Sequence, residues 1–270
     1  MPRKDAARRT GLARALSKLG YCSRSQATEL IRAGRVRLNG SVRRNPETPV
    51  RLGLDCITVD GGAVAALEKI YLVMNKPRGL VTTASDEKGR GTVYSLLEKA
   101  DENLPWVAPV GRLDKASEGL LLLTNDSEWG ARIAAPATHL EKTYHVQIGT
   151  TAGEKLAAAM VSGVRTKDGD FLRAGRGRLL RTGERNCWLE ITLDEGKNRQ
   201  IRRMLAALGV EVLQLVRVAI GPLPLGELAK GTYRRLRTEE KLALDRAMTD
   251  LGPQTSGAGP RRSNFSPGCQ

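Results

Sequence analysis

The first apolar residues along the chain repeat with the period of an α-helix. Residues 12–19 carry leucine and alanine at helical spacing, and Gly20 follows them as a common helix stop. Residues 23–26, Ser-Arg-Ser-Gln, have the sequence of a capping box, which opens a second helix. The apolar residues of that helix share one face, and Gly34 ends it. The sequence therefore predicts two short helices at the start of the chain.

Strand patterns come next. Residues 36–42 alternate apolar and polar side chains around Asn39-Gly40, a pair that favours a two-residue hairpin turn. Residues 57–59 predict a further short strand before the glycines at 61 and 62. Three segments follow from these patterns, namely a basic N-terminal arm, a helix–helix–hairpin unit and a linker, at residues 1–10, 11–58 and 59–69.

The rest of the chain alternates strands with helices. Apolar runs predict strands at residues 70–74, 120–123, 144–148, 188–193 and 210–220. Helical patterns fall at residues 92–99, 151–160 and 199–208, the first capped by Thr92 and the second opened by a capping box over 151–154. This order predicts an α+β domain over residues 70–250, with flanking helices on an extended, largely antiparallel mixed sheet. Residues 251–270 are rich in Gly, Pro and Ser and are expected to be disordered.

The net charge of the chain indicates the kind of partner that it binds. The 270 residues contain 44 Lys and Arg against 29 Asp and Glu, a net charge of +15. Residues 1–60 hold 13 of these cations and 5 of the anions, or +8, so the N-terminal unit is the more cationic part. Such a charge favours binding to a polyanion, most often a nucleic acid. No apolar stretch approaches the roughly 18 residues of a membrane-spanning helix, so a membrane partner is not expected.

Several classes of chemistry lack their motifs. The sequence contains no phosphate-binding loop, no dinucleotide-binding glycine pattern, no HExxH and no GxSxG. Its four cysteines form no CxxC pair and lie far from both histidines, which argues against a zinc site or a disulfide framework. They fit a reducing cytoplasm, and they are Cys22, Cys56, Cys187 and Cys269. Any reaction is therefore expected to use carboxylate, phenol and guanidinium groups, without a cofactor or metal.

The N-terminal unit has a cluster of arginines around its second helix and the following strand. They are Arg24, Arg32, Arg35 and Arg37. The cluster is either a solvated charged face or a surface that follows the phosphates of a nucleic acid.

Residues 111–126 carry the densest polar pattern of the chain. Asp114 lies there in a short loop just before a fully apolar strand, with basic residues on both sides. Asp114 could form or cap the turn. A carboxylate beside cations at the rim of a buried strand could instead stay ionised in a partly dry pocket and take part in a reaction.

Two further side chains have a structural and a chemical interpretation. Tyr144 opens a strand beside Lys142 and His145, so it is either a packing residue or an aromatic group in a charged pocket. Arg202 lies at the border of the apolar face of the predicted helix over 199–208, from which Arg199 and Arg203 point away. It is either solvated or able to reach a half-buried carboxylate.

Taken together, these segments resemble the bacterial ribosomal-RNA pseudouridine synthases of the RsuA type. The resemblance lies in the GRLDKASEGLLLLTND run, the KTY strand and the EGKNRQIRRM helix, in that order and spacing, and in Asn75-Lys76-Pro77-Arg78-Gly79. The closing Arg217–Leu223 and Gly231–Leu236 segments are also similar. Residues 11–58 are similar to the small RNA-binding domain named after small-subunit ribosomal protein four, which precedes the catalytic domain in this family.

The resemblance implies roles for single residues. Asp114 would be the catalytic aspartate, Tyr144 the aromatic group that stacks on the target uracil, and Arg202 the basic partner of Asp114. Weaker candidates for contact with RNA are Arg112, Lys115 and Lys76. Pseudouridine forms when the N-glycosidic bond of uridine breaks and uracil rejoins the ribose through carbon five, which requires no metal, redox step or nucleotide. A carboxylate can attack or stabilise the cationic sugar, either directly or by a glycal route, once the base has left the helical stack.

The sequence thus predicts a cytoplasmic, monomeric enzyme that converts one flipped-out uridine of structured ribosomal RNA, with 23S favoured over 16S. One alternative is a non-catalytic RNA-binding or ribosome-assembly protein, which would have no need of Asp114, Tyr144 and Arg202 together. A second is an RNA methyltransferase, which would require a glycine-rich cofactor loop that the sequence lacks.

Overall fold

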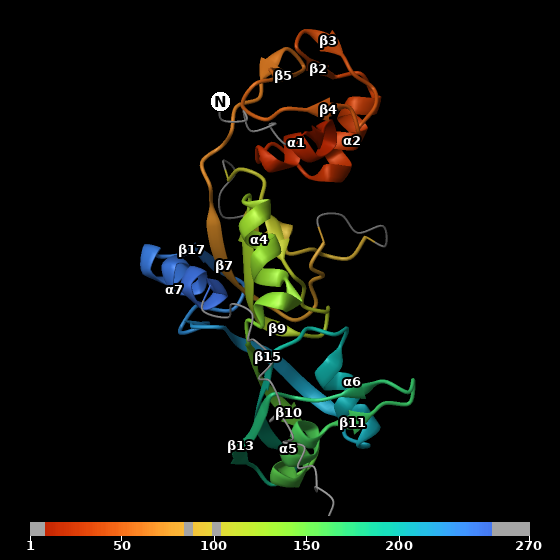
Figure 1. The fold of residues 1–270 in the computed structure, drawn as a ribbon. Helices are drawn as coiled ribbons and strands as arrows, with labels where there is room; N and C mark the ends of the chain where they lie inside the picture. Colours follow the sequence, from red (N-terminus) through yellow and green to blue (C-terminus); the bar gives the residue numbers. More distant parts are fainter. Residues whose placement is uncertain (1–8, 84–88, 99–103, 250–270) are drawn as a thin grey trace, which may run out of the picture.

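The structure is a computed structural model, and it describes residues 9–83, 89–98 and 104–249 (Figure 1). The small N-terminal unit lies at one end of the molecule, and the large sheet extends away from it (Figure 1). The predicted arm, apart from its last two residues, and the predicted tail over 251–270 lie outside the described residues.

The N-terminal unit packs two helices on small sheets. Helix α1 spans Leu12–Lys18 and α2 spans Arg24–Arg32. The capping box at Ser23 is confirmed, because Ser23 and Gln26 each accept a hydrogen bond from the backbone N–H of the other. The predicted hairpin is also present, and the unit contains β1 (Thr10–Gly11), β2 (Val36–Leu38), β3 (Ser41–Val42), β4 (Pro49–Val50), β5 (Ile57–Val59) and β6 (Gly62–Ala63). A core of leucine, isoleucine, valine and alanine side chains joins these elements.

The predicted linker over 59–69 begins too early. The chain turns back at Asp60 and Gly61, both of which have positive φ, and β6 then pairs with β5 in the four-stranded sheet β3-β2-β5-β6. Two positive φ values in a row are the signature of a tight hairpin turn. The connection therefore starts after Ala63, and even there Leu67 donates a backbone hydrogen bond of 3.1 Å to Leu19.

The second part of the chain forms one nine-stranded sheet. Seven strands follow the order β13-β14-β10-β15-β9-β7-β17, while β16 pairs with β15 and β8 pairs with β9. All pairings are antiparallel except the one between β9 and β15. The strands are β7 (Tyr71–Lys76), β8 (Ala108–Val110), β9 (Glu118–Thr124), β10 (Lys142–Ile148), β13 (Arg176–Thr182), β14 (Cys187–Leu193), β15 (Val212–Ile220), β16 (Leu223–Pro224) and β17 (Tyr233–Arg235). A separate hairpin joins β11 (Val164–Arg165) to β12 (Phe171–Leu172).

Five helices and one 3-10 turn accompany this sheet in the described part of the chain. They are α3 (Tyr94–Glu98), α4 (Ser127–Ala134), η1 (Pro136–Thr138), α5 (Gly153–Ser162), α6 (Gln200–Ala207) and α7 (Thr238–Thr249). The pattern predicted α3, α5 and α6 but not α4, α7 or strand β13. The capping box predicted at residues 151–154 is wrong: α5 begins after Ala152 and has no side-chain cap. Asp126, by contrast, caps α4 by accepting hydrogen bonds from the backbone of Glu128 and Trp129.

The parallel pairing of β9 with β15 divides the sheet into two halves. Only two residue pairs form this junction, Glu118 with Val216 and Gly119 with Arg217. Each half has its own hydrophobic core, with the core under β10, β14 and α6 separate from those around β7 and β9. A pairing this short leaves the two halves splayed beyond it, and an open space lies between them.

Candidate active site

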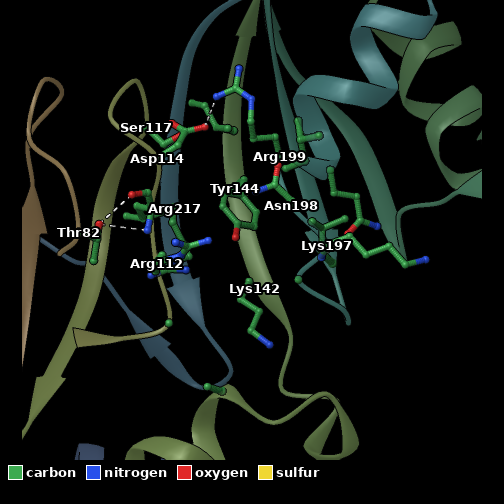
Figure 2. A pocket seen from close by; sticks show the side chains of 18 of the residues that line it. Thr82, Arg112, Asp114, Ser117, Lys142, Tyr144, Lys197, Asn198, Arg199 and Arg217 are labelled. Atoms are coloured by element: carbon green, nitrogen blue, oxygen red, sulfur yellow. Dashed lines mark hydrogen bonds and ion pairs between the residues drawn. The ribbon is translucent and has the colours of Figure 1, made fainter. Parts of the chain in front are cut away.

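A cleft of about 860 Å³ lies at this junction. The loop before β9 forms one wall, and β10, β15 and the start of α6 form the other (Figure 2). Among the described residues, seven Lys or Arg side chains line it but only two acidic ones, Asp114 and Glu195. The cations are Arg90, Arg112, Lys115, Lys142, Lys197, Arg199 and Arg217. The cleft is therefore built to receive an anion.

The loop that carries Asp114 is fixed from several sides. Thr82 donates a 2.7 Å hydrogen bond to the carbonyl of Leu113 and accepts one from its N–H (Figure 2). Ser117 donates a backbone bond to the Asp114 carbonyl, which closes the turn. The Asp114 side chain is 24% exposed, so it can meet a ligand from a rigid position.

Lys76 supports the same loop from beneath. Its ammonium group is fully buried and donates to the carbonyls of Pro77, Asp114 and Ser117 at 3.0, 3.2 and 2.8 Å. Burial lowers the pKa of Lys76 to about 8, and Asp114 acts against that shift. The expectation that Lys76 faces RNA is therefore wrong, because its side chain is buried at the end of β7 and donates to three backbone carbonyls.

Two arginines hold the Asp114 carboxylate. Arg199 Nη1 donates to Oδ2 at 2.9 Å, and Arg202 Nε lies 3.4 Å from the same oxygen. Arg202 also donates to the carbonyl of Ala116 at 3.0 Å, so it fixes both the side chain and the loop. Burial lowers the pKa of Arg202, and its attraction to Asp114 opposes this. The expected pairing of Arg202 with Asp114 is present in the structure.

Arg199 is the contact that helical periodicity missed. The pattern placed it inside a helix and pointing away, but α6 begins at Gln200 and Arg199 is the residue before it. Its φ is 49°, a left-handed conformation that is uncommon for a side chain other than glycine. That backbone turn directs the guanidinium back across the cleft to Asp114. Strain of this kind collects at functional sites.

Tyr144 lies on β10, the strand next to β15 in one half of the sheet. Its half-buried ring packs against the core of each half. Figure 2 shows the ring between the Asp114–Arg199 ion pair and Lys142, with its hydroxyl directed to the side of Lys142. The structure thus brings together Asp114, Tyr144 and Arg202, the three residues to which the family resemblance gives a role in the reaction.

The remaining sequence candidates lie on surfaces. Arg112 and Lys115 are exposed and line the cleft on either side of Asp114. On the N-terminal unit, the four arginines of the predicted basic face are exposed as well: Arg24, Arg32, Arg35 and Arg37. Two of them have partners, because Arg35 pairs with Asp60 at 2.5 Å and Arg37 donates to the Gly40 carbonyl. The hydrogen bond from Arg35 is the main cause of a lowered pKa at Asp60. This pairing reduces the free charge of the face.

The described residues contain neither a metal-binding cluster nor a membrane-spanning helix. No group of three or more His, Cys, Asp or Glu side chains within residues 9–83, 89–98 and 104–249 is arranged to hold a metal ion. In the same ranges no helix has the length and apolar character needed to cross a membrane.

Comparisons with known proteins place this geometry in context. Residues 70–207 match the family described as RNA pseudouridylate synthase, and residues 10–56 match the S4 domain. An RNA pseudouridine synthase of Aquifex aeolicus, named as uncharacterized, is 38% identical over 234 residues, which cover 86% of this chain and 92% of that protein. The ribosomal large subunit pseudouridine synthase B of Bacillus subtilis is 35% identical over 243 residues, covering 89% and 97%.

A solved structure is also similar to this chain. A crystal structure of a pseudouridylate synthase superposes with a TM-score of 0.61 at 31% identity, covering 87% of this chain and 99% of that one. The expected fold class is confirmed, since an S4 domain precedes a large mixed sheet with flanking helices.

Proposed function

This chain belongs to the RNA pseudouridylate synthase family, and on that premise we propose that it converts a specific uridine of ribosomal RNA into pseudouridine. The family assignment confirms the expectation of an enzyme over that of a non-catalytic RNA-binding protein. The observation that carries the proposal is the Asp114 carboxylate, held by two guanidinium groups at the rim of a cationic cleft that Tyr144 also lines.

Asp114 acts on the sugar. Breaking the bond between N1 of uracil and C1′ of ribose leaves positive charge at C1′, which a carboxylate stabilises or captures. Arg199 and Arg202 both engage Oδ2, while Oδ1 has no hydrogen-bond partner among the described residues. The two guanidinium groups hold the carboxylate in place during the reaction and form no covalent bond with it. Direct attack and the glycal route both fit this arrangement.

Tyr144 acts on the base. The detached uracil turns so that C5 meets C1′, forms the new carbon–carbon bond and then loses its C5 proton, while N1 gains one. Because the atoms balance, the reaction requires no outside reagent. The half-buried ring of Tyr144 offers a flat face on which the base stacks during this turn, and its phenol can exchange a proton.

The exposed Arg and Lys side chains bind the RNA. Arg112 and Lys115 flank Asp114 at the mouth of the cleft and contact the strand on either side of the flipped nucleotide. The basic face of the S4 domain, made of Arg24, Arg32, Arg35 and Arg37, binds phosphates of structured RNA at a distance from the reaction. The enzyme works as a monomer in the cytoplasm.

We assign the target to 23S in preference to 16S ribosomal RNA. Support comes from the Bacillus subtilis relative, which is named for the large subunit and aligns over 97% of its length. A match of this extent includes both the S4 domain and the cleft, which are the two parts that contact RNA.

The test uses transcripts of 23S and 16S ribosomal RNA labelled with tritium at C5 of uridine. Each pseudouridine formed releases one tritium to water, and sequencing of the product maps the position. We expect stoichiometric release from one site in 23S RNA by the wild-type protein. The Asp114→Asn variant, which keeps the shape of the side chain, should release none while binding the same transcript.

Three results would count against the proposal. Release from 16S RNA alone would overturn the subunit assignment, and undiminished turnover by Asp114→Asn would remove Asp114 from the chemistry. Absence of release from both transcripts and from assembled subunits would refute the activity. Lys155→Met serves as a control for protein quality, because Lys155 is an exposed residue of α5 outside the cleft.

A further inference from the structure

Three cleft side chains share one face of the sheet. Lys142 and Tyr144 are two residues apart on β10, so their side chains point the same way. Arg217 lies directly opposite Tyr144 on the neighbouring strand β15. All three line the cleft, and Figure 2 shows Lys142 on the side of the tyrosine hydroxyl, away from the Asp114–Arg199 ion pair.

Arg217 is the most unusual of the three. Its side chain is only 5% exposed, and Nε donates a 2.7 Å hydrogen bond to the carbonyl of Leu120. Nη2 is buried and has no hydrogen-bond partner among the described residues. A guanidinium group stays charged in proteins, and a buried charge without a counter-ion is costly. No carboxylate in the described part of the chain forms an ion pair with it.

Lys142 adds a second cation to the same corner. It is half-buried and likewise forms no ion pair within the described ranges. Burial and the nearby charge of Arg217 lower its pKa, whereas Asp194 raises it. Two cations thus lie close together in a partly dry corner, and neither has an ion-pair partner among the described residues. The natural occupant is an anion that arrives with the substrate.

We propose that Lys142 and Arg217 form a subsite for one phosphodiester group of the RNA, next to the nucleotide that Tyr144 stacks. This inference rests on the proposed function and deepens it, because it assigns a substrate contact to residues outside the Asp114, Tyr144 and Arg202 set. Its occupant is a phosphate rather than the uracil ring. The strand rise of about 3.4 Å per residue places Lys142 roughly 7 Å along β10 from Tyr144, beyond the base that stacks there.

Two kinds of phosphate contact would then act together. The S4 domain and the cleft mouth hold phosphates at the surface, where water screens them. The corner of Lys142 and Arg217 holds one phosphate with partial desolvation, so this contact fixes the register of the target nucleotide over Asp114. A cation in this role lowers KM and contributes little to kcat.

The experiment compares Lys142→Met with Lys155→Met, which removes the same charge from an exposed position on α5. Binding of the 23S transcript is measured as a function of KCl concentration, and tritium release gives kcat and KM. We expect Lys142→Met to raise KM by roughly tenfold, with kcat within about twofold of wild type. The slope of log affinity against log salt should fall by about 0.7 to 1, relative to the control.

A second variant keeps the test independent of folding. Arg217→Lys retains the charge but loses Nη2, and we expect a rise in KM with unchanged kcat. A short RNA around the mapped uridine, with one flanking linkage replaced by a neutral methylphosphonate, should lose affinity for the wild type. It should lose no further affinity for Lys142→Met, because the missing charge is already absent from the protein.

The possible failures are distinct. If Lys142→Met lowers kcat at constant KM, or leaves the salt slope equal to that of Lys155→Met, the subsite does not exist as proposed. If the wild type releases no tritium but Lys142→Met still shows the smaller salt slope, the activity is refuted and the phosphate contact stands.

Discussion

Gly119 is the residue on which the geometry of the cleft depends most directly. It lies at the β9–β15 junction with φ of +100°, opposite Arg217. A Cβ atom added there would lie 2.3 Å from the carbonyl oxygen of Arg217 and 2.8 Å from its nitrogen, where ordinary contacts are 3.4–4 Å. Both neighbours are backbone, so only a movement of one strand by about 1 Å could relieve the contact in Gly119→Ala.

Two penalties add up in this variant. The positive φ costs a residue with a Cβ about 1 kcal/mol, and overpacking against backbone costs about 1–3 kcal/mol more. A loss of about 3 kcal/mol corresponds to a fall in Tm of roughly 6–12 °C for a domain of this size. Gly79→Ala is the matched control, because Gly79 has the same φ of +100° but nothing within 4 Å of the added atom. It should cost only about 1 kcal/mol, or roughly 2–4 °C.

Thermal unfolding by circular dichroism and tritium release by the folded fraction provide the assay. Because the junction sets the distance between the Asp114 loop and Tyr144, a shift of about 1 Å should reduce kcat by roughly a hundredfold. If Gly119→Ala and Gly79→Ala were equally stable and equally active, the close approach of the two strands would have no energetic weight. The account of the cleft as a product of this junction would then be refuted.

Two further predictions concern ion pairs. Arg202→Ala should reduce kcat more than Arg199→Ala. Arg202 is largely buried and also donates to the carbonyl of Ala116, whereas Arg199 is half exposed. Equal losses of rate in single-turnover tritium release would contradict this ranking. Hydrogen bonds from Arg234 lower the pKa of Glu240 to about 2, so its contribution to the free energy of unfolding is full above pH 4.5 and is lost as the pH falls through 2. Glu240→Gln should therefore be about 3 kcal/mol less stable than wild type at pH 7, with the gap closing below pH 3 in urea unfolding, and a pH-independent gap would exclude this cause.

Helix starts and hairpin turns were predicted correctly where a strong local sequence motif was present. The capping box at Ser23 and the Asn39-Gly40 hairpin act over a few residues, and both are present. The segment at 151–154 has the same general capping-box pattern but no side-chain cap, because the helix there begins after Ala152 and not after Thr151. Helices α4 and α7 were not predicted, although α4 is as long as α6 and α7 is longer.

The candidate site was predictable in its residue types and not in its contacts. Asp114, Tyr144 and Arg202 were identified from motifs in three separate segments, and the structure brings these segments to one cleft. The sequence did not reveal that Arg199 turns toward Asp114, because that contact depends on a left-handed residue at the start of α6. The sequence also did not reveal that Lys76 is buried, because its burial depends on contact with the loop around Asp114, which lies 38 residues further along the chain.

The sequence by itself determined the charge, the motifs and most of the local elements, because these depend on composition and on neighbours within a few residues. Tertiary structure alone decided the junction of β9 with β15, the pairing of two arginines with one carboxylate oxygen, and the corner in which Lys142 and Arg217 lie with no ion-pair partner in the part of the chain that the structure describes. Each of these depends on distances between segments up to about a hundred residues apart in the chain. Such distances are set by how the cores pack, and a one-dimensional pattern does not contain them.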